Sequence, residues 1–264
     1  MKFSRWLLAR TLALSLLVVS LLVVSLLVVS LPLALRAGSK DKEKGLEGKK
    51  VDSGSFGVFM GGRRVGTETF SIDQNANGSV IQSEFKTEGA SAPSAQKSEL
   101  QLTASGEIKR YEWKELSPGK AQAVVLPSEQ FLTQKWSPNP DDKPQEQVFL
   151  LSAATSILDD YFFVHRQVLA WRYLASACKQ DQGQVQCPVK QRVQFGTLNP
   201  RQRASAPITM EFLGREKVAL HGSQRELNKL EMKSEAGNWE LWLDDQFKVL
   251  RIYIAGENTD VVRD

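Results

Sequence analysis

The chain has 264 residues, of which 42% are hydrophobic and 24% charged, and its formal net charge is +4. The basic excess lies in residues 1–37, which contain Lys2, Arg5, Arg10, Arg36 and no acidic residue, so that 30 of the 34 basic residues remain beyond them against 30 acidic ones. The rest of the chain is neutral, which argues against nucleic acid as a partner, and its length suits one domain with one core.

The first predicted element is an uncharged run from Thr11 to Leu35, which contains three copies of the unit SLLVV after a basic start. This pattern is typical of an export signal. A cleaved signal has an apolar stretch of about 7 to 15 residues, whereas a spanning helix needs about 20. Residues 1–37 are therefore either a signal peptide cut after Ala37 or an N-terminal membrane anchor formed by residues 11–35. Both interpretations predict a periplasmic or other extracytoplasmic protein, released or anchored. No cysteine directly follows the apolar run, so lipidation at the signal junction is not predicted.

Residues 38–53, GSKDKEKGLEGKKVDS, predict a charged flexible linker. The folded domain is predicted at 54–264 and begins with two strand-like runs around Gly61 and Gly62, whose freedom to adopt positive φ suits a tight hairpin. Further turns are predicted at residues 73–79 and 104–106 and in the proline-rich stretch 138–144. Alternating apolar and polar residues between these turns indicate a sheet with one covered and one solvated face.

The period changes in ILDDYFFVHRQVLAWRYL, residues 157–174. Apolar residues there follow helical spacing, which predicts one amphipathic helix at about 153–177. Ser156 is the predicted N-cap, and Asp159 and Asp160 would lie in the first turn, where the helix dipole favours negative charge. Strand-like runs return after the helix, with a last turn at residues 244–246.

Cys178 and Cys187 are the two cysteines, separated by eight residues. In an exported chain this pair predicts one disulfide closing a short loop. A metal site is not predicted, because the chain has two histidines and no CxxC or HExxH pattern.

Asp159, Asp160 and His165 raise the question of a catalytic site. On one helix, side chains meet at spacings of three or four, whereas His165 follows these aspartates by six and five positions. We therefore interpret all three as structural, and His221, which precedes a glycine, as a turn residue. No GxSxG, GxxxxGK[ST] or GxGxxG pattern occurs. No catalytic residue and no cofactor is predicted.

Aromatic residues offer a weaker signal for a ligand site. Trp113, Trp136, Trp171, Trp239 and Trp242 can fill a core or line an apolar pocket, and core filling is the simpler interpretation. If a pocket lies between the helix and the curved sheet, its predicted ligand-binding residues are Tyr161, His165, Trp171, Trp239 and Trp242.

Three stretches carry a resemblance: GVFMGGRRVGTETFSI, ILDDYFFVHRQVLAWRYL, and NWELWLDDQFKVLRIYI followed by NTDVVRD. Together they resemble an uncharacterised family of bacterial exported β-barrel proteins, a domain of unknown function, similar in architecture to periplasmic lipoprotein carriers. The resemblance covers roughly residues 54–264. It implies a half-barrel whose covering helix encloses acyl chains, and it carries over no active-site residue.

The sequence therefore predicts a mainly β fold: a single antiparallel β-barrel or strongly curved sheet with one amphipathic helix packed on it. The first functional hypothesis is a non-enzymatic envelope protein that binds or carries an apolar ligand such as a lipid. The alternative is a structural or protein-interaction module of the envelope, with an unidentified protein partner. A hydrolase or metal enzyme comes third and would need His165 or His221 to converge with aspartates from other segments.

Overall fold

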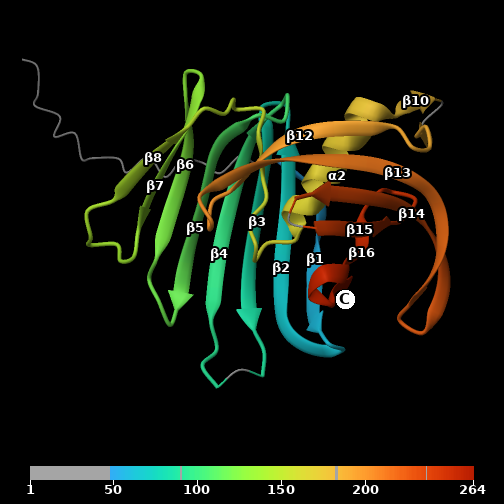
Figure 1. The fold of residues 1–264 in the computed structure, drawn as a ribbon, viewed down its shortest axis with the longest axis horizontal. Helices are drawn as coiled ribbons and strands as arrows, with labels where there is room; N and C mark the ends of the chain where they lie inside the picture. The colour runs from blue at the N-terminus through green and yellow to red at the C-terminus, as the bar shows by residue number, and fades with distance from the viewer. Residues whose placement is uncertain (1–47, 90, 182–183, 236) are drawn as a thin grey trace, which may run out of the picture. The chain divides into compact units, whose positions relative to one another are not determined.

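The computed structural model describes residues 48–264 apart from 90, 182–183 and 236 (Figure 1). The predicted signal peptide or anchor and most of the predicted linker, residues 1–47, lie outside the described residues. Within the described part of the chain, no helix has the length and apolar character needed to cross a membrane.

One sheet of 15 strands dominates the fold, and all but one of its strand pairs are antiparallel. Its first half is a meander in which each strand pairs with the next. The strands are β1 Lys49–Met60, β2 Arg63–Asn75, β3 Gly78–Thr87, β4 Ala95–Thr103, β5 Ile108–Ser117, β6 Gln122–Ser128, β7 Phe131–Ser137 and β8 Gln145–Phe149. The predicted hairpin turn between β1 and β2 is confirmed: Gly61 and Gly62 have φ values of 55° and 79°, which favour glycine.

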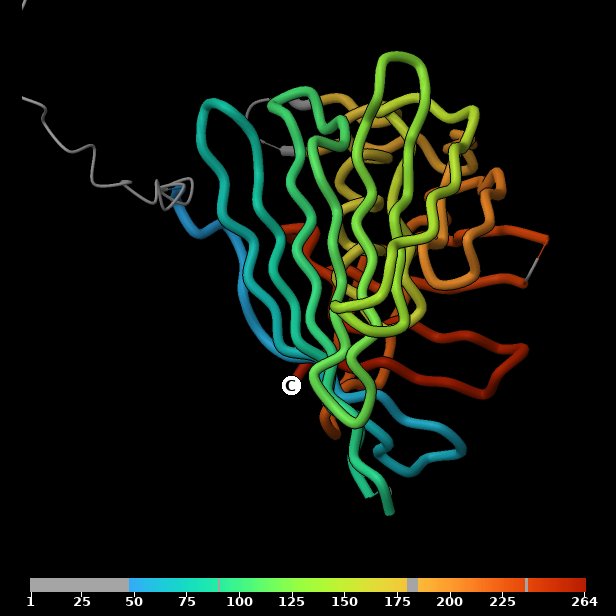
Figure 2. The backbone as a smooth tube through the Cα atoms, turned by 90° about the vertical axis from the view of Figure 1, so that its left-hand side faces the viewer, coloured from blue at the N-terminus to red at the C-terminus, as the bar shows by residue number. Residues whose placement is uncertain are grey.

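A second meander follows the helix and returns to the first. Its elements are β12 Arg192–Asn199, β13 Ala204–Leu220, β14 Ser223–Ser234, β15 Gly237–Leu243, β16 Val249–Ile254, the short 3-10 helix η1 Ala255–Glu257, and β17 Thr259–Arg263. β17 pairs with β1 in the middle of the sheet. Figure 2 shows the strands of the first meander side by side, with the hairpins of the second to their right.

The sheet is strongly curved but not closed, so of the two predicted architectures the curved sheet is confirmed and the closed barrel is wrong. Its edges are β8 and the two-residue strand β9, Ser156–Ile157, which pairs in parallel with β12. The two ends of the sheet are in contact without strand pairing between them. Gln134 Nε2 of β7 donates to the backbone carbonyl of Pro200, which follows β12, at 2.7 Å.

The helix α2, Val164–Ala177, starts 11 residues later than the predicted start at 153. Ser156 is not its N-cap, because Ser156 and Ile157 are already paired with β12. Asp159 then accepts the backbone N–H of Tyr161, which makes a turn rather than a helix. Ile157, Leu158, Phe162 and Phe163 are buried in the main core although they precede α2, so their helical spacing did not mark a helix.

The predicted linker also ends earlier than residue 53, because β1 begins at Lys49 and pairs with β2 from there. Asp52 explains the difference. The residue is only 3% exposed, and its carboxylate forms ion pairs with Arg263 at 2.7 Å and Lys248 at 3.2 Å. A charge that marked a flexible segment in the sequence is thus neutralised by distant basic residues.

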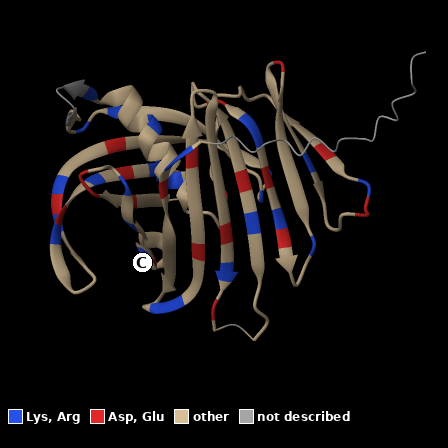
Figure 3. Cartoon of the chain, turned by 180° about the vertical axis from the view of Figure 1, so that it is seen from behind, with Lys and Arg blue, Asp and Glu red and all other residues tan. Residues whose placement is uncertain are grey.

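The inner face of the sheet and α2 enclose the main core, to which both meanders contribute. A second, smaller cluster lies on the outer face, where Val218, Leu220 and Leu227 of the long β13–β14 hairpin pack with Trp242 and Leu250. The outer face of the first meander is polar, and acidic and basic residues are interspersed along its strands (Figure 3). The predicted contrast between a covered and a solvated face is confirmed there.

Candidate functional site

Ionisable side chains gather around the N-terminal end of α2, in the interior of the protein. We call this group the polar cluster; its members are Glu68, Tyr111, Asp159, His165, Arg166 and Arg201. Burying a charge is costly unless it is paired and hydrogen-bonded. The partners of each member therefore decide what the cluster can do.

Asp159 is fully buried in the stretch that precedes α2. Its Oδ2 accepts the Tyr111 hydroxyl at 2.7 Å and Arg201 Nε at 2.9 Å, while Oδ1 accepts the Tyr161 amide at 3.0 Å. The ion pair with Arg201 compensates the buried negative charge. Burial and the adjacent Asp159 carboxylate raise the pKa of Tyr111 well above its usual value, so this phenol remains a proton donor.

Arg201 comes from the turn between β12 and β13 and reaches across to the first meander. The carbon atom of its guanidinium lies 3.6 Å from the ring centroid of Trp113 and 4.9 Å from that of Tyr161, close enough for cation–π attraction. Arg201 therefore joins the β12–β13 turn to the first meander through Trp113, and to the stretch before α2 through Asp159 and Tyr161.

Glu68 of β2 takes the place of an N-cap for α2, which has no side-chain cap of its own. Its carboxylate accepts the backbone N–H groups of Phe163 at 2.7 Å and Val164 at 3.3 Å, and the Ser83 hydroxyl at 2.6 Å. A helix N-terminus favours such a negative group. Burial nevertheless dominates and raises the pKa of Glu68 from 4.5 to about 7.

His165 and Arg166 are the first-turn side chains of α2 that face this cluster. Burial lowers the pKa of His165 to about 3, so its ring is neutral at physiological pH. Its Nδ1 accepts the Asp159 backbone amide at 3.5 Å. The guanidinium of Arg166 donates to the backbone carbonyls of Asp159 and Phe162 and lies 4.5 Å from the ring centroid of Trp239.

The structure corrects the predicted positions of Asp159 and Asp160. The two aspartates precede the helix rather than lying in its first turn. The Asp159 carboxylate is occupied by Tyr111 and Arg201, while Asp160 accepts from Asn199 at 2.6 Å on the surface. The other predicted structural residue, His221, lies in the β13–β14 turn at a positive φ of 49°.

The five predicted ligand-binding residues do not surround one pocket. Tyr161 is 38% exposed beside Phe85, and His165 is buried. Trp171 donates its Nε1–H to the Phe247 carbonyl at 2.7 Å. Trp239 packs against the main core, whereas Trp242 belongs to the second cluster on the opposite face.

A second polar anchor holds Gln167, near the start of α2, and the sequence analysis did not identify it. Gln167 Nε2 donates to Asp52 Oδ2 at 2.6 Å, and Gln167 Oε1 accepts the Val249 amide at 2.9 Å. Asp52 is held in turn by Arg263. Although burial acts to raise the pKa of Asp52, its bonds to Arg263 and Gln167 outweigh burial and lower it.

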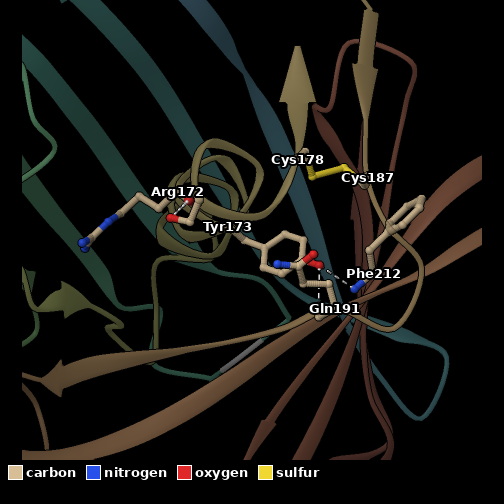
Figure 4. Close-up of a disulfide and its surroundings, with 7 residues drawn as sticks. Arg172, Tyr173, Cys178, Cys187, Gln191 and Phe212 are labelled. Carbon is tan, nitrogen blue, oxygen red and sulfur yellow. Dashed lines mark hydrogen bonds between the residues drawn. A yellow bond between two sulfur atoms is a disulfide. The ribbon is translucent and has the colours of Figure 1, made fainter. Parts of the chain in front are cut away.

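The predicted disulfide between Cys178 and Cys187 is confirmed, with the two Cα atoms 4.3 Å apart (Figure 4). It fixes the C-terminal end of α2 to the small hairpin of β10 Lys179–Asp181 and β11 Gln184–Gln186. Beside it, the Tyr173 hydroxyl donates to the Gln191 carbonyl at 2.7 Å and accepts the Phe212 amide at 3.1 Å. Both ends of α2 are therefore fastened. A disulfide is compatible with an exported protein.

Side chains pack closely beneath α2, where Val164, Leu169, Ala170 and Tyr173 are fully buried. The cavity found there, beside His165 and Leu169, has a volume of about 10 Å³, which is room for one water at most. Among the residues that the structure describes, no three His, Cys, Asp or Glu side chains are grouped so as to hold a metal ion. The polar cluster fastens the start of α2 to the sheet through Glu68 and to the preceding stretch through Arg166.

No protein-family model matches the chain, and no curated protein matches it either. A solved structure that it resembles is the crystal structure of a DUF1089 family protein from Pseudomonas aeruginosa, with 10% sequence identity, a TM-score of 0.38, and coverage of 69% of this chain and 87% of that one. A similarity this weak supports no argument about function. The resemblance to lipoprotein carriers stays a prediction.

Proposed function

We propose that the protein is an exported, non-enzymatic interaction module of the cell envelope, which binds its partner on the surface of a rigid curved sheet. It develops the second hypothesis raised by the sequence, a structural or protein-interaction module of the envelope, but does not require the partner to be a protein. Export is supported by the apolar run at residues 11–35 and is compatible with the Cys178–Cys187 disulfide.

One observation carries this choice: the volume of about 10 Å³ beneath α2. A site that encloses a small apolar ligand usually measures about 300 to 1,000 Å³. To admit an acyl chain, α2 would have to leave both Glu68 and the Asp52–Gln167 anchor, which would leave buried polar groups without partners. These contacts favour a helix that stays in place, rather than a lid that opens as in a carrier.

The experiment is native mass spectrometry of the purified domain after incubation with a total lipid extract. We expect the unliganded mass alone. The matched control is Leu169→Ala, which removes a fully buried side chain from the inner face of α2 and should create an apolar cavity able to take up a small apolar molecule such as benzene. Co-purification of an acyl ligand with the wild-type domain would overturn the proposal in favour of the carrier.

A further inference from the structure

A groove lies on the outer face of the sheet, opposite α2, where β1, β17 and β16 run side by side. The register places Phe59, Asp260 and Tyr253 in one row across the three strands. Their neighbours Val58, Val261 and Ile252 are buried in the main core, so the row itself faces outward. The groove is therefore separate from the polar cluster.

The groove has a volume of about 460 Å³. Its lining is formed by Phe59, Gly62, Arg251, Tyr253, Asn258, Asp260 and Val262. The two aromatic residues stand on either side of Asp260, and each is only partly buried. The groove thus combines two accessible aromatic side chains with a polar floor.

Gly57 fixes one wall of this groove. A Cβ atom at Gly57 would lie 2.9 Å from the Phe59 ring and 3.0 Å from the guanidinium carbon of Arg64. The missing side chain therefore leaves the space into which the Phe59 ring leans. Arg64 lies 5.8 Å from the ring centroid and is held by Asp264 at 2.9 Å, so the ring has a fixed neighbour.

The floor is electrically balanced. Arg251 donates from Nε and Nη2 to the two oxygens of Asp260 at 2.8 and 2.9 Å, and this paired geometry holds both side chains in place. Because the two charges cancel, the groove favours neither a cation nor an anion. Hydrogen-bonding capacity remains: within the described residues, no partner is seen for Arg251 Nη1, the Asn258 side-chain amide or the Tyr253 hydroxyl.

We propose that this groove binds a neutral sugar, such as one pyranose unit of a glycan. A pyranose has an apolar C–H face, which can pack on the Phe59 or Tyr253 ring because the face of an aromatic ring is electron-rich. Its hydroxyl groups are both donors and acceptors, which matches a floor that presents an arginine, a carboxylate and an amide together. The volume of about 460 Å³ accommodates one or two sugar rings.

This inference names the partner and the surface for the proposed interaction module, and it rests on that function in taking the outer surface as the binding side. The two can fail separately. An acyl ligand inside the protein would overturn the proposed function, whereas an empty interior with no sugar binding would overturn the groove assignment alone.

The test is saturation-transfer NMR on the purified domain with cellobiose, maltose and N,N′-diacetylchitobiose as probes, at millimolar concentration. We expect signal transfer to at least one of them, and at least a tenfold weaker affinity for Phe59→Ala and for Asp260→Asn. Phe131→Ala is the matched control, because Phe131 is also a partly exposed aromatic, 37% exposed, on the distant β6–β7 turn. Its binding should equal that of the wild type.

Folding of each variant is checked by its thermal unfolding midpoint. If Asp260→Asn unfolds because Arg251 loses its partner, Tyr253→Ala replaces it and should weaken binding to the same extent. Transfer to none of the three probes would overturn the inference, as would equal binding by Phe59→Ala and wild type. Inorganic sulfate and tetramethylammonium should not compete for the groove; competition by either would show that it selects charge instead.

Discussion

Glu68 gives the sharpest prediction, because its carboxyl group is fully buried while it accepts the first backbone N–H groups of α2. Burial raises its pKa from 4.5 in the unfolded chain to about 7 in the folded protein. The folded state therefore holds this proton at pH values where the unfolded state has already released it. The stability that Glu68 contributes is fully present below pH 4.5 and is lost as the pH rises through about 7.

The magnitude follows from the size of this rise in pKa. One pKa unit corresponds to about 1.4 kcal/mol, so the difference between folded and unfolded states amounts to about 3 kcal/mol. In Glu68→Gln the side chain keeps its volume and one acceptor oxygen but does not titrate. Relative to this variant, the wild type should lose about 3 kcal/mol of unfolding free energy between pH of about 4 and about 8.

The assay is urea unfolding of both proteins across this pH range, with the free energy of unfolding extrapolated to water. All other titrating groups are common to the two proteins and cancel in the difference. Glu84→Gln, which removes a carboxyl group from the outer face of the next strand, is the matched control for the substitution itself. A constant difference, or one in which the wild type gains stability with rising pH, would refute the argument that burial outweighs the helix N-terminus.

Two further predictions concern the helix and its end. His165 should behave in the opposite direction from Glu68, because its pKa is about 3 in the folded protein against 6.5 when unfolded. As the pH falls from about 7 to about 3, the wild type should lose about 5 kcal/mol of unfolding free energy relative to His165→Gln. Acid unfolding measures this loss, and acid transitions that run parallel in the two proteins would contradict it. Replacing both Cys178 and Cys187 by serine should lower the unfolding free energy by about 2 to 3 kcal/mol, because the unfolded chain regains the freedom of the short loop; calorimetry showing unchanged stability would contradict it.

Local patterns in the sequence predicted much of the fold. Gly61 and Gly62 form the turn that their conformational freedom indicated, and Cys178 and Cys187 are close in the chain as well as in space. In the structure, alternation along β15 puts Trp239 on the covered face. The same alternation puts Trp242, three residues later, on the opposite face, so the sequence already held the reason why these two tryptophans do not share a pocket.

Contacts between distant residues could not be predicted in this way. Asp52 looked like part of a charged linker because its partner Arg263 is 211 positions away. The start of α2 was predicted too early, since pairing of Ser156 with β12 depends on a strand that follows later in the chain. Likewise, nothing near Arg201 in the sequence indicates that it pairs with Asp159, so the polar cluster was missed.

The pairing of β17 with β1 has a consequence for the order of folding. Ser55 on β1 bonds to Asp264 at the far end of β17, 209 positions later. As the chain leaves the ribosome or a membrane channel from its N-terminal side, β1 must wait with one edge unpaired until β17 arrives. Such a high contact order predicts slow folding, and a chain that stays open during synthesis would suit the export that we propose.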